Sequence, residues 1–252
     1  MADRVKMLRA RGEPVLIFAG LFILWELLVR WADLPGWLLP APSAIVATAL
    51  EWAPELASNS LVTLRETVLG FAVALVISIP LAVVIAFTTV PRRVLYPILL
   101  GLQSVPKVAL APLVTLWMGV GELPKTVIVI LVCFFPILVN MITGLEAAPK
   151  AMVDLMTSLR ASQKDMFLRL RLKVALPYAF TGCKIAVTFA VIGAVIAEFV
   201  AAQSGLGYLI LMATAQSLTA LAFAAIILLT VMSVILFYLI EWVEKRVITW
   251  RV

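Results

Sequence analysis

The side chains that usually carry catalysis or bind metals are scarce in this chain. The 252 residues include no histidine, and the two cysteines, Cys133 and Cys183, lie inside apolar runs. A structural zinc site usually needs four Cys or His ligands, and the sequence offers no Ser/His or paired-carboxylate constellation. We therefore expect no catalytic residue and no metal site, and we expect both cysteines to act as small buried apolar side chains.

A nucleotide-binding loop is also missing. The phosphate cradle of many ATPases reads G-x-x-x-x-G-K-[ST]. The stretch "GELPKT" from Gly121 contains Lys-Thr but lacks that glycine spacing. The chain is not expected to bind a cofactor, ATP or magnesium itself, so active transport would take its energy from a separate subunit.

One charged segment, Asp154 to Pro177, lies between two strongly apolar stretches. The connection from Glu146 to Leu176 carries six basic and three acidic residues. Its apolar residues recur at helical spacing: Met152, Leu155, Met156, Leu159, Met166, Phe167, Leu170 and Val174. The pattern fits either a basic helix lying on anionic lipid or a helix that docks a cytoplasmic partner.

The elements that carry this segment are predicted to be membrane-spanning helices. Hydrophobic residues make up 64% of the chain and charged residues only 13%, against about a quarter charged in a soluble domain. Several apolar runs have the length of about 20 residues that crosses a bilayer. We predict an all-α polytopic membrane protein, a single transmembrane domain over 1–252, with six spans near residues 14–29, 67–89, 94–117, 126–145, 178–202 and 220–242.

The basic residues predict the orientation of these spans. Six spans place 15 of the 20 Lys and Arg residues on one side, which the positive-inside rule makes cytoplasmic. That side holds the N-terminal cluster up to Arg11, the pair Arg92 and Arg93, the 146–176 loop, and the C-terminal group from Lys245. Both termini are therefore expected in the cytoplasm. The net charge of +6 reflects this distribution and does not indicate a nucleic-acid partner.

The ends of the first span are less regular. No small-x-small cleavage site follows Val29, so an uncleaved first span is favoured over a signal peptide. Glu26 and Arg30 are predicted to form a local ion pair. Prolines and Asn/Ser break up the connection that follows, except for a short amphipathic helix from Pro42 with Ser43 as its N-cap.

Polar groups at membrane depth predict a path for solute. Pro97, Pro106 and Pro112 interrupt the third span, and irregular backbone at that depth is tolerated where it faces protein or water. We predict that the path and a gate involve Gln103, Ser104, Pro106, Lys107, Pro112 and Glu198. Glu198 precedes the helix-breaking Gly205 and Gly207, although a glutamate reaching the interface is the alternative. Lys184 is expected to extend to the lipid interface, and small residues in spans two and five predict close helix packing.

Several motifs, in one order along residues 20–245, resemble the permease subunits of ABC importers. The segment "DLMTSLRAS…VALP" resembles their EAA loop, with Asp154 at the acid position, Arg160 in place of a glycine and Leu172-Lys173 in place of a first Leu-Pro. Further matches are "LPAPSAI" from Leu39, "PKVALAPLVTLWMGVGELPK" from Pro106 and "AEFVAAQSGLGYLI" from Ala197. Without the glycine, the loop is expected to run straighter or to bend by another route.

The resemblance implies a type I importer permease of the bacterial cytoplasmic (inner) membrane. It implies two cytoplasmic ABC ATPase subunits that bind ATP and magnesium, a second permease copy in a homodimer, and an extracytoplasmic solute-binding protein. Coupling to the ATPase falls to Asp154, Leu155, Met156, Leu159, Arg160, Ala161 and Ser162.

The solute implied by the resemblance is nitrate-, sulfonate- or taurine-like, or a thiamine pyrimidine precursor, riboflavin or an aromatic acid. A stand-alone secondary transporter or channel and an intramembrane enzyme remain the alternatives. Both fit poorly, because no Asp lies within a span and His is absent.

Overall fold

The computed structural model describes residues 2–88, 94, 97–99 and 101–250, with the side chains of residues 2–16 and 201 excepted. These residues form helices and no strand, so the all-α prediction is confirmed. The helices are α1 (Ala2–Trp31), α2 (Pro42–Glu51), α3 (Ala53–Phe87), α5 (Lys107–Met118), α6 (Glu122–Glu146), α7 (Lys150–Ser158), α8 (Gln163–Asp165), the π-helix η1 (Met166–Arg171), α9 (Leu172–Ala201), α10 (Leu206–Ala215) and α11 (Thr219–Val247).

Four of these segments are long and apolar enough to cross a membrane. They are Ala53–Phe87, Glu122–Glu146, Gln163–Val200 and Thr219–Val247. A fifth arises if Pro97–Gln103 and Lys107–Met118, which meet at 92°, form one broken span. The polytopic prediction is confirmed, and the described residues supply four or five of the six expected spans. The expected first span, near 14–29, lies within α1, which is not among these segments.

One predicted boundary differs from the structure, and another cannot be compared with it. The second span was expected from residue 67, but α3 begins at Ala53, so residues 53–66 are helical rather than broken up by Asn and Ser. The predicted end of that span at Thr89, the basic pair Arg92 and Arg93, and part of the third span lie outside the described residues.

The chain divides into two compact units. One contains the residues up to Ser58 together with Leu209–Leu228, and the other contains Asn59–Tyr208 and the residues from Leu229. Helices α3, α10 and α11 contribute residues to both.

In the first unit, α1 and α2 are joined by the Glu26 carboxylate. Glu26 accepts hydrogen bonds from Arg30 at 2.6 Å and from the Ser43 hydroxyl and amide at 2.7 and 3.0 Å. The predicted Glu26–Arg30 pair is confirmed. The predicted Ser43 cap is wrong: Ala41 is the N-cap of α2, and Pro42 fills the first helical position, where its missing N–H costs nothing.

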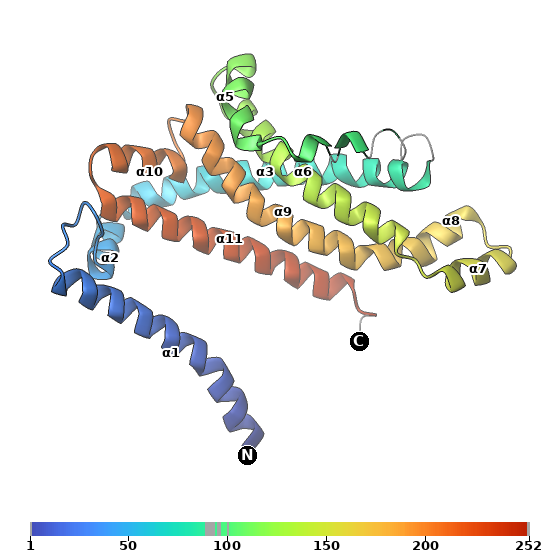
Figure 1. The fold of residues 1–252 in the computed structure, drawn as a ribbon, viewed down its shortest axis with the longest axis horizontal. Coiled ribbons are helices and arrows are strands. Elements are labelled where there is room, and N and C mark those ends of the chain that lie inside the picture. The colour runs from blue at the N-terminus through green and yellow to red at the C-terminus, as the bar shows by residue number, and fades with distance from the viewer. Residues whose placement is uncertain (1, 89–93, 95–96, 100, 251–252) are drawn as a thin grey trace. The chain divides into compact units, whose positions relative to one another are not determined.

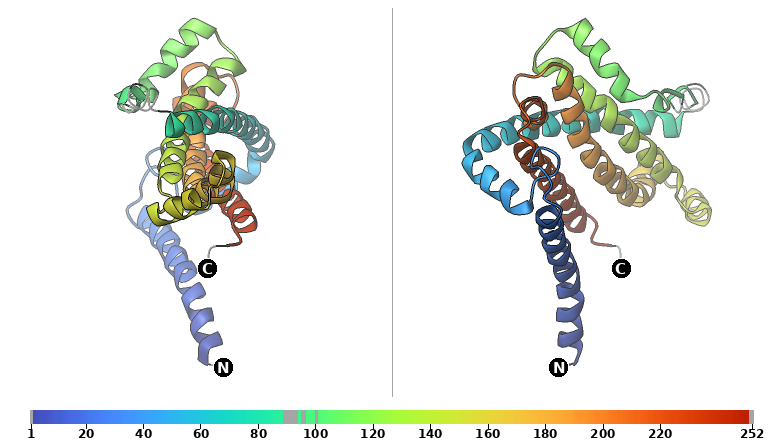
Figure 2. Two further views of the ribbon diagram at one scale, coloured as in Figure 1. Left: turned by 90° about the vertical axis from the view of Figure 1, so that its right-hand side faces the viewer. Right: turned by 60° about the vertical axis from the view of Figure 1, so that its left-hand side comes forward.

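The core of the second unit lies where α6 and α9 run side by side (Figures 1 and 2). Small residues of α9 face larger ones of α6: Ala186, Ala190 and Ala194 pack with Val129, Cys133 and Ile137. Ala74 of α3 joins this cluster, and a side chain at Gly70 would overlap Val129. Close packing through small residues is therefore confirmed. Both cysteines are buried and free, as expected.

Candidate functional site

The predicted coupling segment begins with α7, which carries no buried residue. Leu155 is 58% exposed and Leu159 72% exposed, and Met152 is also exposed. Met156 is half-buried, and Asp154 is exposed beside this apolar surface. Large apolar side chains on one face of a short helix leave a surface suited to a partner.

Helix α7 ends in a sharp turn at Arg160. Arg160 has a φ of 55°, in the left-handed region. The amide of Arg160 donates to the Thr157 carbonyl at 2.9 Å, and the amide of Ala161 donates to the Met156 carbonyl at 3.0 Å. This is the hydrogen-bond pattern of a Schellman cap, in which glycine usually takes the left-handed position. Of the two expectations for this loop, the straighter helix is wrong: the chain bends at the same place with arginine.

Beyond the turn, the chain starts a new helical segment. Ser162 is the N-cap of α8, because its hydroxyl accepts from the Asp165 amide at 3.1 Å. The segments α8, η1 and α9 then continue as one run from Gln163 to Val200. The predicted coupling residues Arg160, Ala161 and Ser162 therefore connect an exposed helix to a long membrane-length one.

The apolar pattern of the segment divides at this turn. Met166 and Leu170 are buried, and the Phe167 ring meets Phe87 of α3 edge-on at 5.5 Å. Arg171 lies over the same Phe87 ring at 5.1 Å. The second half of the predicted pattern thus packs inside the unit, and only the half on α7 remains exposed.

The predicted path residues around the third span lie at its break. Gln103, Ser104 and Pro106 are exposed, as is Pro112 within α5. The Lys107 ammonium lies 5.1 Å from the centre of the Phe135 ring and 3.4 Å from the Gln103 carbonyl oxygen. The following residues, Ala111 and Val114, pack against Ala197 of α9.

Glu198 lies apart from these exposed residues, because its side chain is 1% exposed. Its carboxylate accepts from the Thr63 hydroxyl at 2.7 Å and from the Gly207 amide at 2.5 Å. The Leu206 amide donates to the Thr63 oxygen, and the Gly205 amide donates to Asn59. The alternative that Glu198 simply reaches the interface does not fit, because the carboxylate secures the turn between α9 and α10 to α3.

A buried ion pair was missed from the sequence. Glu66 and Lys125, 3% and 6% exposed, form a short ion pair that joins α3 to α6. A second, exposed ion pair joins the same two helices, because Arg65 of α3 lies 3.1 Å from Glu122 of α6. The signal in the sequence is the charged pair Arg65-Glu66 and the nearby Glu122 and Lys125, which lie far apart along the chain.

Lys184 corrects another expectation. Its ammonium donates to Glu244 at 2.7 Å, joining α9 to α11, and both side chains are largely buried. Lys184 therefore lies against protein rather than extending to lipid.

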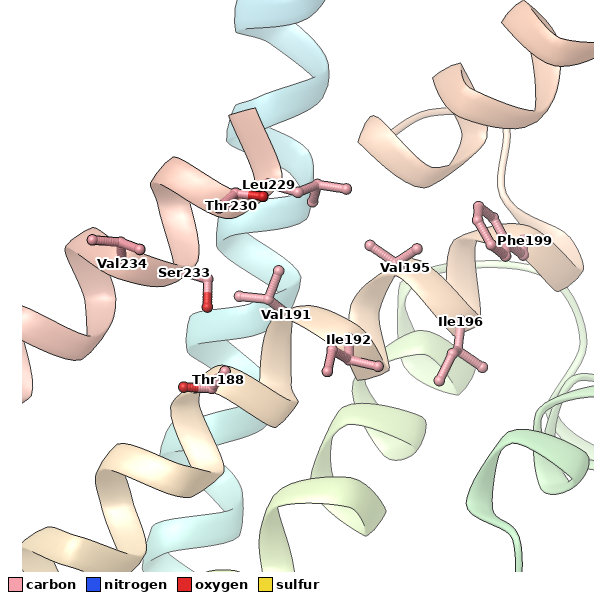
Figure 3. Close-up of a pocket in the computed structure, with 10 residues that line it drawn as sticks. All are labelled: Thr188, Val191, Ile192, Val195, Ile196, Phe199, Leu229, Thr230, Ser233 and Val234. Atoms are coloured by element: carbon pink, nitrogen blue, oxygen red, sulfur yellow. The ribbon is translucent and has the colours of Figure 1, made fainter. Parts of the chain in front are cut away.

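A groove of about 490 Å³ lies between α9 and α11 (Figure 3). Its walls are mainly apolar, and the hydroxyls of Thr188, Thr230 and Ser233 lie along it, with Phe199 at the far end. None of the predicted path residues lines this groove. Among the described residues, no three His, Cys, Asp or Glu side chains lie close enough to hold a metal ion.

Comparison with known families decides what this architecture belongs to. Residues 74–249 match the family of binding-protein-dependent transport system inner membrane components. The chain belongs to this family. It is an ABC importer permease, a multi-pass protein of the inner membrane, and such permeases generally work with ATPase and solute-binding partners.

Similar permeases cover nearly the whole chain. A probable ABC transporter permease of Haemophilus influenzae is 35% identical over 95% of this chain and 98% of its own length. The formylaminopyrimidine transport permease ThiX of Halalkalibacterium halodurans is 33% identical over 95% and 96%. The riboflavin transport permease RibX of Chloroflexus aurantiacus is 30% identical over 96% and 91%.

Proposed function

We propose that this permease is driven by two cytoplasmic ABC ATPase subunits that engage α7. The observation that carries this proposal is the exposed surface of Leu155 and Leu159 on a helix with no buried residue. ATP and magnesium would bind only to the ATPases, and Asp154 and Arg160 would pair with charges at the rim of the ATPase groove. Two copies of the chain would form the pathway, and a solute-binding protein would deliver the solute.

Motion of the ATPases would reach the spans through the turn at Arg160. The run from Gln163 to Val200 is continuous with that turn and half buried in the unit. A rigid connection of this kind allows two states of the ATPases to select two states of the membrane helices.

The test is co-purification with the ATPase subunit of the same transport system. The double variant Asp154→Lys with Leu159→Glu is expected to lower recovery of the ATPase at least about tenfold, because it reverses one charge and places another on the apolar surface. Its unfolding temperature should stay near that of the unchanged chain, since both side chains are exposed. Leu123→Glu, at a residue 65% exposed in the first turn of α6, is the matched control. Normal recovery of the ATPase with the double variant would refute the docking proposal.

We propose that the solute is a small nitrogen-containing heteroaromatic compound. The support is that permeases for formylaminopyrimidine and riboflavin, both of this chemical class, match at 33% and 30% identity, whereas the aliphatic sulfonate permease SsuC of Bacillus subtilis matches at 26%. The groove between α9 and α11 has a lining suited to such a ring, with apolar walls, hydroxyls and Phe199.

Competition for uptake separates the solute classes. In vesicles that contain the complete transporter, an aminopyrimidine or a flavin should compete with the labelled solute, and an aliphatic sulfonate should not. Ser233→Leu, which narrows the groove, should lower uptake without changing ATPase recovery, while Thr143→Leu on exposed α6 surface should change neither. Competition by the sulfonate alone would overturn the solute class.

A further inference from the structure

Three charged side chains meet inside the second unit. Glu66, Lys125 and Glu198 are 3%, 6% and 1% exposed, and they come from α3, α6 and α9. Lys125 pairs with the Oε1 atom of Glu66. Glu198 accepts from Thr63 and from the amide of Gly207. We refer to Glu66 and Glu198 as the carboxyl pair.

One oxygen of the carboxyl pair has no donor. The Oε2 atom of Glu66 is buried and has no hydrogen-bond partner among the residues that the structure describes. On α3, Glu66 lies one turn after Thr63, whose hydroxyl donates to the Oε1 atom of Glu198 at 2.7 Å, so the two carboxyl groups lie on the same face of α3. Ionised carboxylates only accept hydrogen bonds. Two neighbouring carboxylates therefore lack a donor between them, and one bound proton would supply it.

The charges of the group lead to the same result. If Glu66 and Glu198 are both ionised, the single positive charge of Lys125 balances only one of them. The group then has a net charge of −1, and an unpaired buried charge is costly. The other charged groups facing this site, Arg65 and Glu122, are mostly exposed and already pair with each other at 3.1 Å. They cannot supply the missing positive charge.

We propose that Glu66 and Glu198 share one bound proton, which makes the group of Glu66, Lys125 and Glu198 neutral. The shared proton gives the Oε2 atom of Glu66 a donor and keeps the Glu198 carboxylate against the amide of Gly207. Loss of the proton places two negative charges side by side and weakens the hold of α3 on the turn at Gly205–Gly207.

The proton can be observed by infrared spectroscopy on the full-length chain in lipid nanodiscs. At neutral pH, the unchanged chain should show the C=O stretching band of a protonated carboxyl group, with the expected shift in deuterated buffer. Glu66→Gln and Glu198→Gln should each abolish the band, because one carboxylate and one ammonium then balance. Glu122→Gln, which alters the exposed neighbouring pair, is the matched control and should retain it. Absence of the band from the unchanged chain, or its survival in either single variant, would overturn the proposal.

Thermal unfolding and hydrogen exchange add two further tests to the infrared measurement. Both single glutamine variants should unfold near the temperature of the unchanged chain, whereas the double variant should unfold well below it, because Lys125 loses its counter-ion. If the glutamine variants fail to fold, the carboxyl band and the hydrogen exchange of the unchanged chain still test the proposal. As pH rises, hydrogen exchange at the amides of Gly205–Gly207 should accelerate as the carboxyl band disappears. Exchange that stays constant while the band is lost would refute the role of the proton in holding the turn.

Discussion

Glu198 and the turn that it secures leave no space for a larger residue at Gly205. A methyl group on Gly205 would overlap the Glu198 carboxylate, and the φ of 110° is one that side chains rarely adopt. At Gly119, by contrast, the φ is 80° but nothing lies within 4 Å of an added methyl group. The two glycines therefore separate the cost of overlap from the cost of backbone strain.

We expect Gly119→Ala to lower the free energy of unfolding by about 1–3 kcal/mol through backbone strain alone, and Gly205→Ala to lower it by clearly more, because overlap adds to strain. Thermal unfolding of the purified chain measures both changes. Equal losses in the two variants would mean that the Glu198 side chain moves aside and does not fix the turn.

Arg160 is the second residue with a conformation that favours glycine. Arg160→Gly is expected to keep the turn and to stabilise the chain by about 1 kcal/mol, since a side chain in the left-handed region is strained. The same variant should weaken recovery of the ATPase if the guanidinium pairs with an acidic group there. A higher unfolding temperature with unchanged ATPase recovery would limit Arg160 to its backbone role, and a lower unfolding temperature would contradict the cap.

At the scale of the helices, hydrophobic spacing predicted the helical class well but could not show where the pattern divides. The apolar residues from Met152 to Val174 keep helical spacing across the turn at Arg160, so nothing in their periodicity separates the exposed half from the buried half. The early start of α3 was missed because Asn59, Thr63 and Glu66 look like loop residues in isolation. Their partners, in the α9–α10 turn and on α6, are distant in sequence.

The pair of Lys184 and Glu244 ties α9 to α11 and can be tested by a double-mutant cycle. Either Lys184→Met or Glu244→Gln should lower the free energy of unfolding by about 2 kcal/mol, because each removes an ion-pair partner from a largely buried charge. The double variant should recover much of this loss. Losses that simply add in the double variant would show that the two side chains act independently.

At the scale of the whole molecule, the order of motifs predicted the family, and the composition predicted the membrane class. Composition and motifs are spread over the chain, so they survive errors at single boundaries. Of the candidate site, only the apolar pattern on α7 is local enough to be read from the sequence, and its role in coupling stays a prediction. The group of Glu66, Lys125 and Glu198 depends on contacts between three helices, which no single stretch of sequence contains.

Orientation in the membrane is the remaining prediction at this scale. Cys133 and Cys183 are buried, so an added surface cysteine should dominate labelling. A thiol reagent that cannot cross the membrane should label Lys150→Cys only from the cytoplasmic side and Leu123→Cys only from outside. Labelling of Lys150→Cys from outside in intact cells would reverse the orientation and remove the ATPase from reach of α7.

The continuous run from Gln163 to Val200 has a mechanical consequence. Its 38 residues correspond to a rod of roughly 57 Å at 1.5 Å per residue, whereas a bilayer with its headgroups is about 40–45 Å thick. A rod of this length that crosses the bilayer at a small tilt is longer than the barrier, so one end projects into water. A push on the projecting end reaches the far side along one helical run, in which the π-helical turn η1 and Pro177 are the places where it can bend.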